Sequence, residues 1–187
     1  MTSRKGLYVA LLLVGALAGA PWALTQAVWG DSADIDANTF STGTITLSTN
    51  PTTALVSFAG MLPGDQVTAP VTVSNDGAMD MRYAMTTAVT NSTLGDGLTL
   101  AVKSGVLLCD DSGFGLTGTS LYSGSLTAGA IGDPAQGADT GDRALAASAT
   151  ETLCFQVALP TTASNALQNT TTTATFTFAG EQTLSNP

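Results

Sequence analysis

The chain has 187 residues with 5 basic and 14 acidic side chains, which gives a net charge of −9 and suits a single domain. Such a negative surface repels phosphate backbones, so nucleic acid is excluded as a partner. Histidine is absent, which excludes Ser-His-Asp and Cys-His catalysis and the HExxH zinc site.

Residues 1–27 have the pattern of a helical signal peptide. Arg4 and Lys5 precede an apolar run that is shorter than the roughly 20 residues of a membrane span, so contact with the membrane is expected to be transient. Cleavage after Ala27 would make Val28 the first residue of the mature chain, and an uncleaved anchor is the alternative. Removal of the leader leaves three basic side chains against the same 14 acids, a net charge of 3 − 14 = −11.

The N-terminal segment of the mature chain, residues 28–40, alternates in hydropathy with a period of two. Apolar residues stand at Trp29, Ala33, Ile35 and Ala37, with mainly small or acidic residues between them. This pattern predicts a half-buried strand over residues 28–37. A terminal strand with one apolar face can fold back onto its own sheet or add to the sheet of a neighbouring molecule.

Residues 41–187 are predicted to form an all-β domain of two antiparallel sheets. Alternating apolar residues predict strands at about 41–48, 55–59, 66–74, 79–89, 98–102, 153–159 and 174–178. Pro63-Gly64-Asp65 has the composition of a turn, and Asn75-Asp76-Gly77 that of a hairpin turn. Residues 106–108 are predicted to be a buried run. A short strand between residues 117 and 126 and a long loop over 128–142 complete the pattern.

Two sets of sulfur-containing side chains invite a chemical interpretation. Met79, Met81 and Met85 recur on one side of a predicted strand, a spacing that favours core packing over a copper site. Cys109 and Cys154 are the only cysteines, and in a secreted chain they predict one disulfide, with two buried free thiols as the alternative.

Short motifs occur in a fixed order along the chain. They are Ala27, Trp29 and Asp31, then Asn38-Thr39-Phe40, Gly43 and Leu47, then Pro63-Gly64-Asp65 and Asn75-Asp76-Gly77, and finally Thr175-Phe176-Thr177-Phe178. In this order they resemble the motifs of the TasA/camelysin family, whose precursors are cut by a dedicated signal peptidase. Gly30 departs from the family pattern, because relatives often carry a larger residue there.

The resemblance implies a secreted β-sandwich of jelly-roll type that forms fibres in the biofilm matrix or on the cell surface. In such fibres the N-terminal strand of one subunit completes the sheet of the next. Carried over to this sequence, the donor strand comprises Val28, Trp29, Asp31, Ala33, Ile35 and Ala37. The expected partner is therefore a second copy of the chain, joined head to tail.

Three alternatives remain open at the level of sequence. Asp133, Asp139 and Asp142 could bind calcium, although their spacing is not that of an EF-hand. A monomeric cell-surface adhesion module would use the loop at 128–142 as its contact surface. The camelysin name suggests a secreted metallopeptidase, but no cluster of zinc ligands is visible in the sequence. We expect a non-enzymatic protein with no catalytic residue, no metal and no cofactor.

Overall fold

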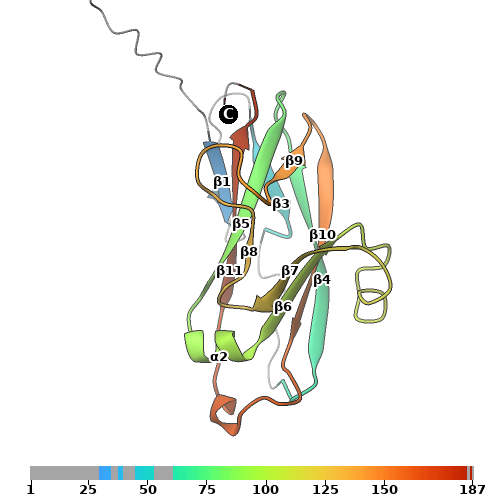
Figure 1. Cartoon of the computed structure of the whole chain (residues 1–187), viewed down its shortest axis with the longest axis vertical. Coiled ribbons are helices and arrows are strands. Elements are labelled where there is room, and N and C mark those ends of the chain that lie inside the picture. The colour runs from blue at the N-terminus through green and yellow to red at the C-terminus, as the bar shows by residue number, and fades with distance from the viewer. Residues whose placement is uncertain (1–29, 35–37, 40–44, 53–60, 185, 187) are drawn as a thin grey trace, which may run out of the picture.

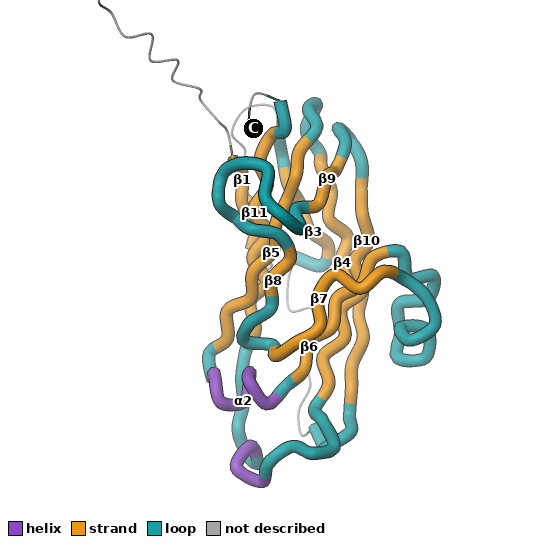
Figure 2. Tube along the Cα trace, in the orientation of Figure 1, coloured by secondary structure: helices purple, strands orange, loops and turns teal. Residues whose placement is uncertain are grey.

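A computed structural model describes residues 30–34, 38–39, 45–52, 61–184 and 186 of the chain. In this part of the chain two antiparallel sheets pack face to face (Figures 1 and 2). The predicted leader with its cleavage site at Ala27, the donor residues Val28, Trp29, Ile35 and Ala37, the motif residues Phe40 and Gly43, and the predicted strand at 55–59 lie outside the described residues. Among the described residues, no helix has the length and hydropathy needed to cross a bilayer.

The first sheet, called here the β11 sheet, contains the strands from both ends of the described chain. Its order is β2 (Asn38–Thr39), β1 (Gly30–Asp34), β11 (Ala174–Gln182), β5 (Met81–Val89) and β8 (Ala130–Ile131), and β9 (Arg143–Leu145) also pairs with β5. The predicted alternation in β11 is confirmed, because Phe176 and Phe178 are buried while Thr175 and Thr177 are more exposed.

The second sheet, called here the β10 sheet, contains the central strands of the chain. Its order is β3 (Leu47–Asn50), β4 (Gln66–Asn75), β10 (Thr150–Ala158), β6 (Thr99–Ser104) and β7 (Thr119–Ser125). A short helix, α2 (Ser92–Gly97), is capped by the Asn91 side chain, and the 3-10 helix η1 (Asn165–Leu167) lies before β11. The predicted sandwich is therefore confirmed, while its jelly-roll connectivity stays a prediction.

The core lies between the two sheets and is filled from both. Phe155 of the β10 sheet packs edge to face against Phe176 of the β11 sheet, with ring centroids 5.0 Å apart. Met81 and Met85 are fully buried in the same cluster, which confirms their predicted role in packing. Each such side chain contributes roughly 1.5 to 3 kcal/mol by leaving water.

The predicted hairpin at Asn75-Asp76-Gly77 is wrong. The segment joins β4 of the β10 sheet to β5 of the β11 sheet, and these strands do not pair with each other. The cause is the buried Asn75 side chain, whose Nδ2 donates to the carbonyls of Met79 at 2.8 Å, Ala146 at 3.0 Å and Leu145 at 3.2 Å. These bonds hold the start of β5 next to β9, so the chain crosses from one sheet to the other.

The predicted buried run at residues 106–108 is also wrong, since Leu107 and Leu108 are both exposed. Gly105 has a φ of +67°, which few residues other than glycine adopt, and the chain leaves the sheet there. The turn at Pro63-Gly64-Asp65 is confirmed. Gly64 has a φ of +100°, and the Asp65 amide donates to the Leu62 carbonyl at 2.9 Å.

A buried polar contact connects the two sheets. Tyr83 of β5 donates its hydroxyl to Glu151 of β10 at 2.6 Å, and Glu151 also pairs with Arg143 of β9. The Tyr83 ring is buried against Phe178, so the hydroxyl reaches across the core to a carboxylate near its rim. Burial, together with the hydrogen bond to Glu151, raises the pKa of Tyr83 far above its ordinary value of 10.0.

Replacement of Asn75 by alanine should destabilise the fold strongly. The Asn75→Ala variant leaves the buried Leu145 carbonyl and its part-buried neighbours without their donor, at a cost of about 2–4 kcal/mol in the free energy of unfolding. Urea unfolding followed by circular dichroism measures this value. The exposed Asn165→Ala is the matched control and should change stability by less than about 0.5 kcal/mol. Equal effects of the two substitutions would contradict this role of Asn75.

The raised pKa of Tyr83 makes stability depend on alkaline pH. Above about pH 10 the unfolded chain loses the Tyr83 proton while the folded chain retains it, so the unfolded state binds fewer protons and stability falls as pH rises. Relative to Tyr83→Phe, the wild type should lose up to about 1.4 kcal/mol per pH unit in that range. Urea unfolding of both proteins between about pH 8 and pH 11 tests this expectation. Parallel stability curves over the whole range would refute it.

Candidate functional site

The described part of the predicted donor strand, β1, pairs with β11 of its own chain. The antiparallel register places Gly30 opposite Glu181, Ala33 opposite Phe178 and Asp34 opposite Thr177. On its other side β1 pairs with β2, which contains the motif residues Asn38 and Thr39. Of the two outcomes expected for a terminal strand, the structure of the single chain therefore shows the tail folded back onto its own sheet (Figure 1).

Strand β11 is consequently paired along both edges. Its pairing with β5 extends over the whole strand, from Ala174 to Gln182, while the pairing with β1 covers residues 177–181. Phe178 lies in the part shared by both neighbours, and its side chain is fully buried. Without β1, the backbone groups on one edge of β11 would lose their partners, and β11 could accept another extended strand.

The carboxylate of Glu181, at the end of β11 that lies opposite the start of β1, is bound by three neighbouring groups. It accepts hydrogen bonds from Arg82 Nε of β5 at 2.5 Å, from Asn186 Nδ2 at 2.8 Å and from the Gly137 amide at 3.2 Å. Arg82 also donates to the Asn186 carbonyl, and both side chains of the ion pair are largely buried. Glu181 thus connects β5, the C-terminal segment and the loop at 132–142, at the position opposite the start of β1.

A cavity of about 210 Å³ lies between the loop at 132–142 and the outer face of β5 and β11. Its lining includes Arg82 and Glu181, together with Asp133, Gln136 and Asp142 from the loop. The Asp142 carboxylate accepts from the Asp133 amide at 3.0 Å and the Asp139 amide at 3.1 Å, so it holds the loop in shape. Among the described residues no three His, Cys, Asp or Glu side chains come together in a metal-binding group, and the calcium candidates are not assembled into one.

The remaining predicted site residues lie apart from this edge. Leu47 is buried in β3, Pro63-Gly64-Asp65 forms its turn, and the Cys109–Cys154 disulfide is confirmed, with Cα atoms 5.6 Å apart. Sequence reasoning missed Arg82, Glu181 and Asn186. The sequence does show a charged residue in each of two otherwise uncharged strands, Arg82 in β5 and Glu181 in β11. That these two side chains meet depends on the register of β5 and β11, which pairs positions 99 residues apart.

A comparison with models of protein families gives a match to the N-terminal half of the chain. A family model described as camelysin metallo-endopeptidase matches residues 5–100. No curated protein matches the chain. The matched span includes residues 5–27 of the predicted leader, β1 to β5 and the turn motif at Pro63-Gly64-Asp65.

The description of that family implies a catalytic metal, and the side chains in the described part of the chain do not assemble a site for one. The sequence has no histidine, and both cysteines are consumed by the disulfide. In the part of the chain that the structure describes, Glu151 and Glu181 bind arginines, and Asp110 and Asp142 accept backbone amides. A catalytic zinc site needs three protein ligands from His, Cys, Asp or Glu.

Family membership rests on the extent of the match and on the order of the motifs. The family model covers more than half of the 187 residues. Within that span lie Leu47 of β3 and the Pro63-Gly64-Asp65 turn, both of which belong to the motif set recognised in the sequence. The chain therefore belongs to the camelysin metallo-endopeptidase family, that is, to the TasA/camelysin family that its sequence resembles.

Proposed function

We propose that this protein is a secreted structural subunit that polymerises head to tail into extracellular, biofilm-matrix fibres by exchange of β1 between molecules. The observation that carries the proposal is the pairing of β1 with β11, which is already paired with β5 on its other edge. The predicted cleavage after Ala27 would leave β1 at the N-terminal end of the mature chain. The pattern of the leader and the disulfide both support export from the cytosol. A signal peptidase that cuts after Ala27 would be the second partner.

Strand exchange requires little new structure. The backbone hydrogen bonds between β1 and β11 form equally well within one chain or between two chains. A high protein concentration therefore favours the exchanged form. In the exchanged form each subunit donates one strand and accepts another at a different surface. Such an interface is heterologous, and when its rotation does not close a ring it generates an open filament. The family resemblance supports the same arrangement.

The proposed role is non-enzymatic. The family description favours a peptidase as the second candidate function. The lack of an assembled set of metal-ligating side chains among the described residues weighs against it. The loop at 128–142 was the expected surface of a monomeric adhesion module. In this loop the Asp142 carboxylate binds backbone amides of the loop itself, and the Gly137 amide donates to Glu181 of β11. These groups therefore serve the fold of the loop rather than a contact surface.

Engineered disulfides should distinguish exchange from self-pairing. Ser32 and Ala179 are opposite each other in the β1–β11 register, where Cα atoms lie roughly 4.5–5.5 Å apart, within the range that a disulfide spans. When the single variants Ser32→Cys and Ala179→Cys are mixed and oxidised, exchanged strands should yield covalent dimers on non-reducing gels. The double variant, oxidised while dilute, should be locked as a monomer, and electron microscopy should show filaments only after reduction.

The matched control pairs Ser32→Cys with Thr175→Cys, which lies four residues further along β11 and out of reach. A chain lacking residues 28–37 provides a second test, because it can accept a strand but cannot donate one. It should therefore shorten filaments of the intact chain when mixed with it. Filaments of normal length from the locked variant, or from the truncated chain alone, would refute strand exchange.

The peptidase alternative predicts a different result. We expect purified protein incubated with casein and zinc to show no chelator-sensitive cleavage, because the described residues offer no assembled set of metal ligands. Mass spectrometry of the digest is the measurement, with thermolysin as the positive control. Chelator-sensitive cleavage that is lost when Asp133 and Asp142 are replaced by asparagine would establish the enzyme instead.

A further inference from the structure

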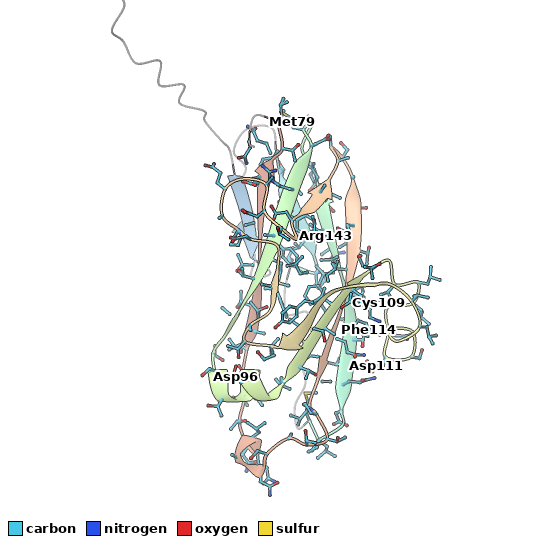
Figure 3. All side chains as sticks on the ribbon, in the orientation of Figure 1. Met79, Asp96, Cys109, Asp111, Phe114 and Arg143 are labelled. Atoms are coloured by element: carbon cyan, nitrogen blue, oxygen red, sulfur yellow. A yellow bond between two sulfur atoms is a disulfide. The ribbon has the colours of Figure 1, made fainter. Side chains whose placement is uncertain are left out.

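The connection between β6 and β7, residues 105–118, forms a loop that projects from the outer face of the β10 sheet (Figures 1 and 3). We call it the leucine loop. Cys109 of this loop is bonded to Cys154 of β10. Leu153 and Phe155 on either side belong to the core, so Cys154 points to the opposite face of the sheet, where it is nevertheless fully buried. The loop therefore packs on the sheet and is covalently attached to it.

Further contacts fix the shape of the leucine loop. Lys103 of β6, opposite Cys154 in the sheet, donates to the Phe114 carbonyl at 2.8 Å and lies 4.7 Å from the centre of the buried Phe114 ring. The Asp110 carboxylate accepts from the amides of Ser112 and Gly113, at 2.9 and 2.8 Å. Where the two ends of the loop approach each other, Leu107 donates its amide to Thr117 Oγ1 at 3.1 Å. The loop is thus held in one shape rather than left free.

This ordered loop presents three leucines to solvent. Leu107 is 88% exposed, Leu116 81% and Leu108 55%. In the part of the chain that the structure describes, they are three of the five large hydrophobic side chains that are exposed. Phe114 and the disulfide already anchor the loop, so the leucines are not needed to attach it. Exposed apolar side chains gathered on a rigid support are typical of a protein interaction site.

The surrounding charge indicates which kind of partner fits. Asp110 and the exposed Asp111 lie between Leu108 and Leu116, and the hydrogen bonds from Ser112 and Gly113 keep the pKa of Asp110 low. Beyond the leader the chain has only three basic side chains. Arg82 is paired with Glu181, Arg143 with Glu151, and Lys103 covers Phe114. Beyond the leader, a second copy therefore offers these aspartates no arginine that is not already paired and no lysine other than Lys103, whereas a basic partner offers several such side chains.

We propose that the leucine loop binds a different protein, one whose contact surface combines an apolar groove or helix face with lysine or arginine residues at its rim. Leu107, Leu108 and Leu116 enter the apolar part, and Asp110 and Asp111 meet the basic rim. The site lies on the outer face of the β10 sheet, on a strand connection separate from the β1–β11 pairing. Binding at the loop is therefore independent of the proposed polymerisation.

Two synthetic amphipathic helical peptides test the proposal on the purified secreted chain. They share the same leucine positions, but one has lysine and the other glutamate at every polar position. Fluorescence anisotropy at about 0.15 M salt should show binding of the lysine peptide only. The Leu107→Ser/Leu116→Ser variant should bind it about tenfold more weakly, because apolar burial is lost. Both residues are exposed, so circular dichroism should show an unchanged fold.

Leu184→Ser is the matched control, since Leu184 is 65% exposed but lies outside the loop, and it should bind like the wild type. Four results would overturn the proposal. They are no binding of the lysine peptide, equal binding by the loop variant, equal binding of the glutamate peptide, and a concentration-dependent dimer that the Leu107→Ser/Leu116→Ser variant abolishes. The last result, measured by sedimentation velocity, would assign the loop to contacts between copies of this chain.

Discussion

The pairing of β11 on both edges is the constraint on which the rest of the structure depends. β5 pairs with the full length of β11, and β1 fills the opposite edge from Thr177 to Glu181. Phe176 and Phe178 project from the same strand into the core, so displacement of β11 would also disrupt the contact between the sheets. An unpaired edge of β11 could pair with any extended segment, from the same chain or from another. Whether β1 comes from the same chain or from a second copy therefore decides between a monomer and an assembly.

Polar side chains at one end of the sandwich determine how the chain passes between the sheets. Asn75 holds the crossing segment against β9, Tyr83 reaches Glu151 across the core, and Arg82 joins Glu181. Arg143 also pairs with Glu151, so both arginines of the described chain are held in ion pairs. Because the remaining charges are mostly acidic, the exterior has a negative field, which favours basic partners and disfavours close approach of identical molecules through charged surfaces.

Alternation of apolar residues was enough to predict most strands and the core, because a strand with one buried face repeats every two residues. It could not predict which sheet a strand joins. Asn75-Asp76-Gly77 has the composition of a hairpin, but the bond from Asn75 to Leu145, 70 residues away, decides its path. The apolar run at 106–108 looks buried, yet Gly105 turns it outward. The contact between Arg82 and Glu181 likewise required the register of β5 and β11.

The position of the disulfide has a consequence for the order of events during maturation. The cross-link joins Cys109 to Cys154, and the chain between them includes β7 to β9 and the start of β10 but neither β1 nor β11. Formation of the disulfide therefore requires neither the predicted cleavage of the leader nor the pairing of β1, so under the proposed function it does not depend on which molecule supplies that strand. In the proposed fibre subunit, the cross-linked part of the sandwich can thus be complete before the backbone pairing of β1 forms.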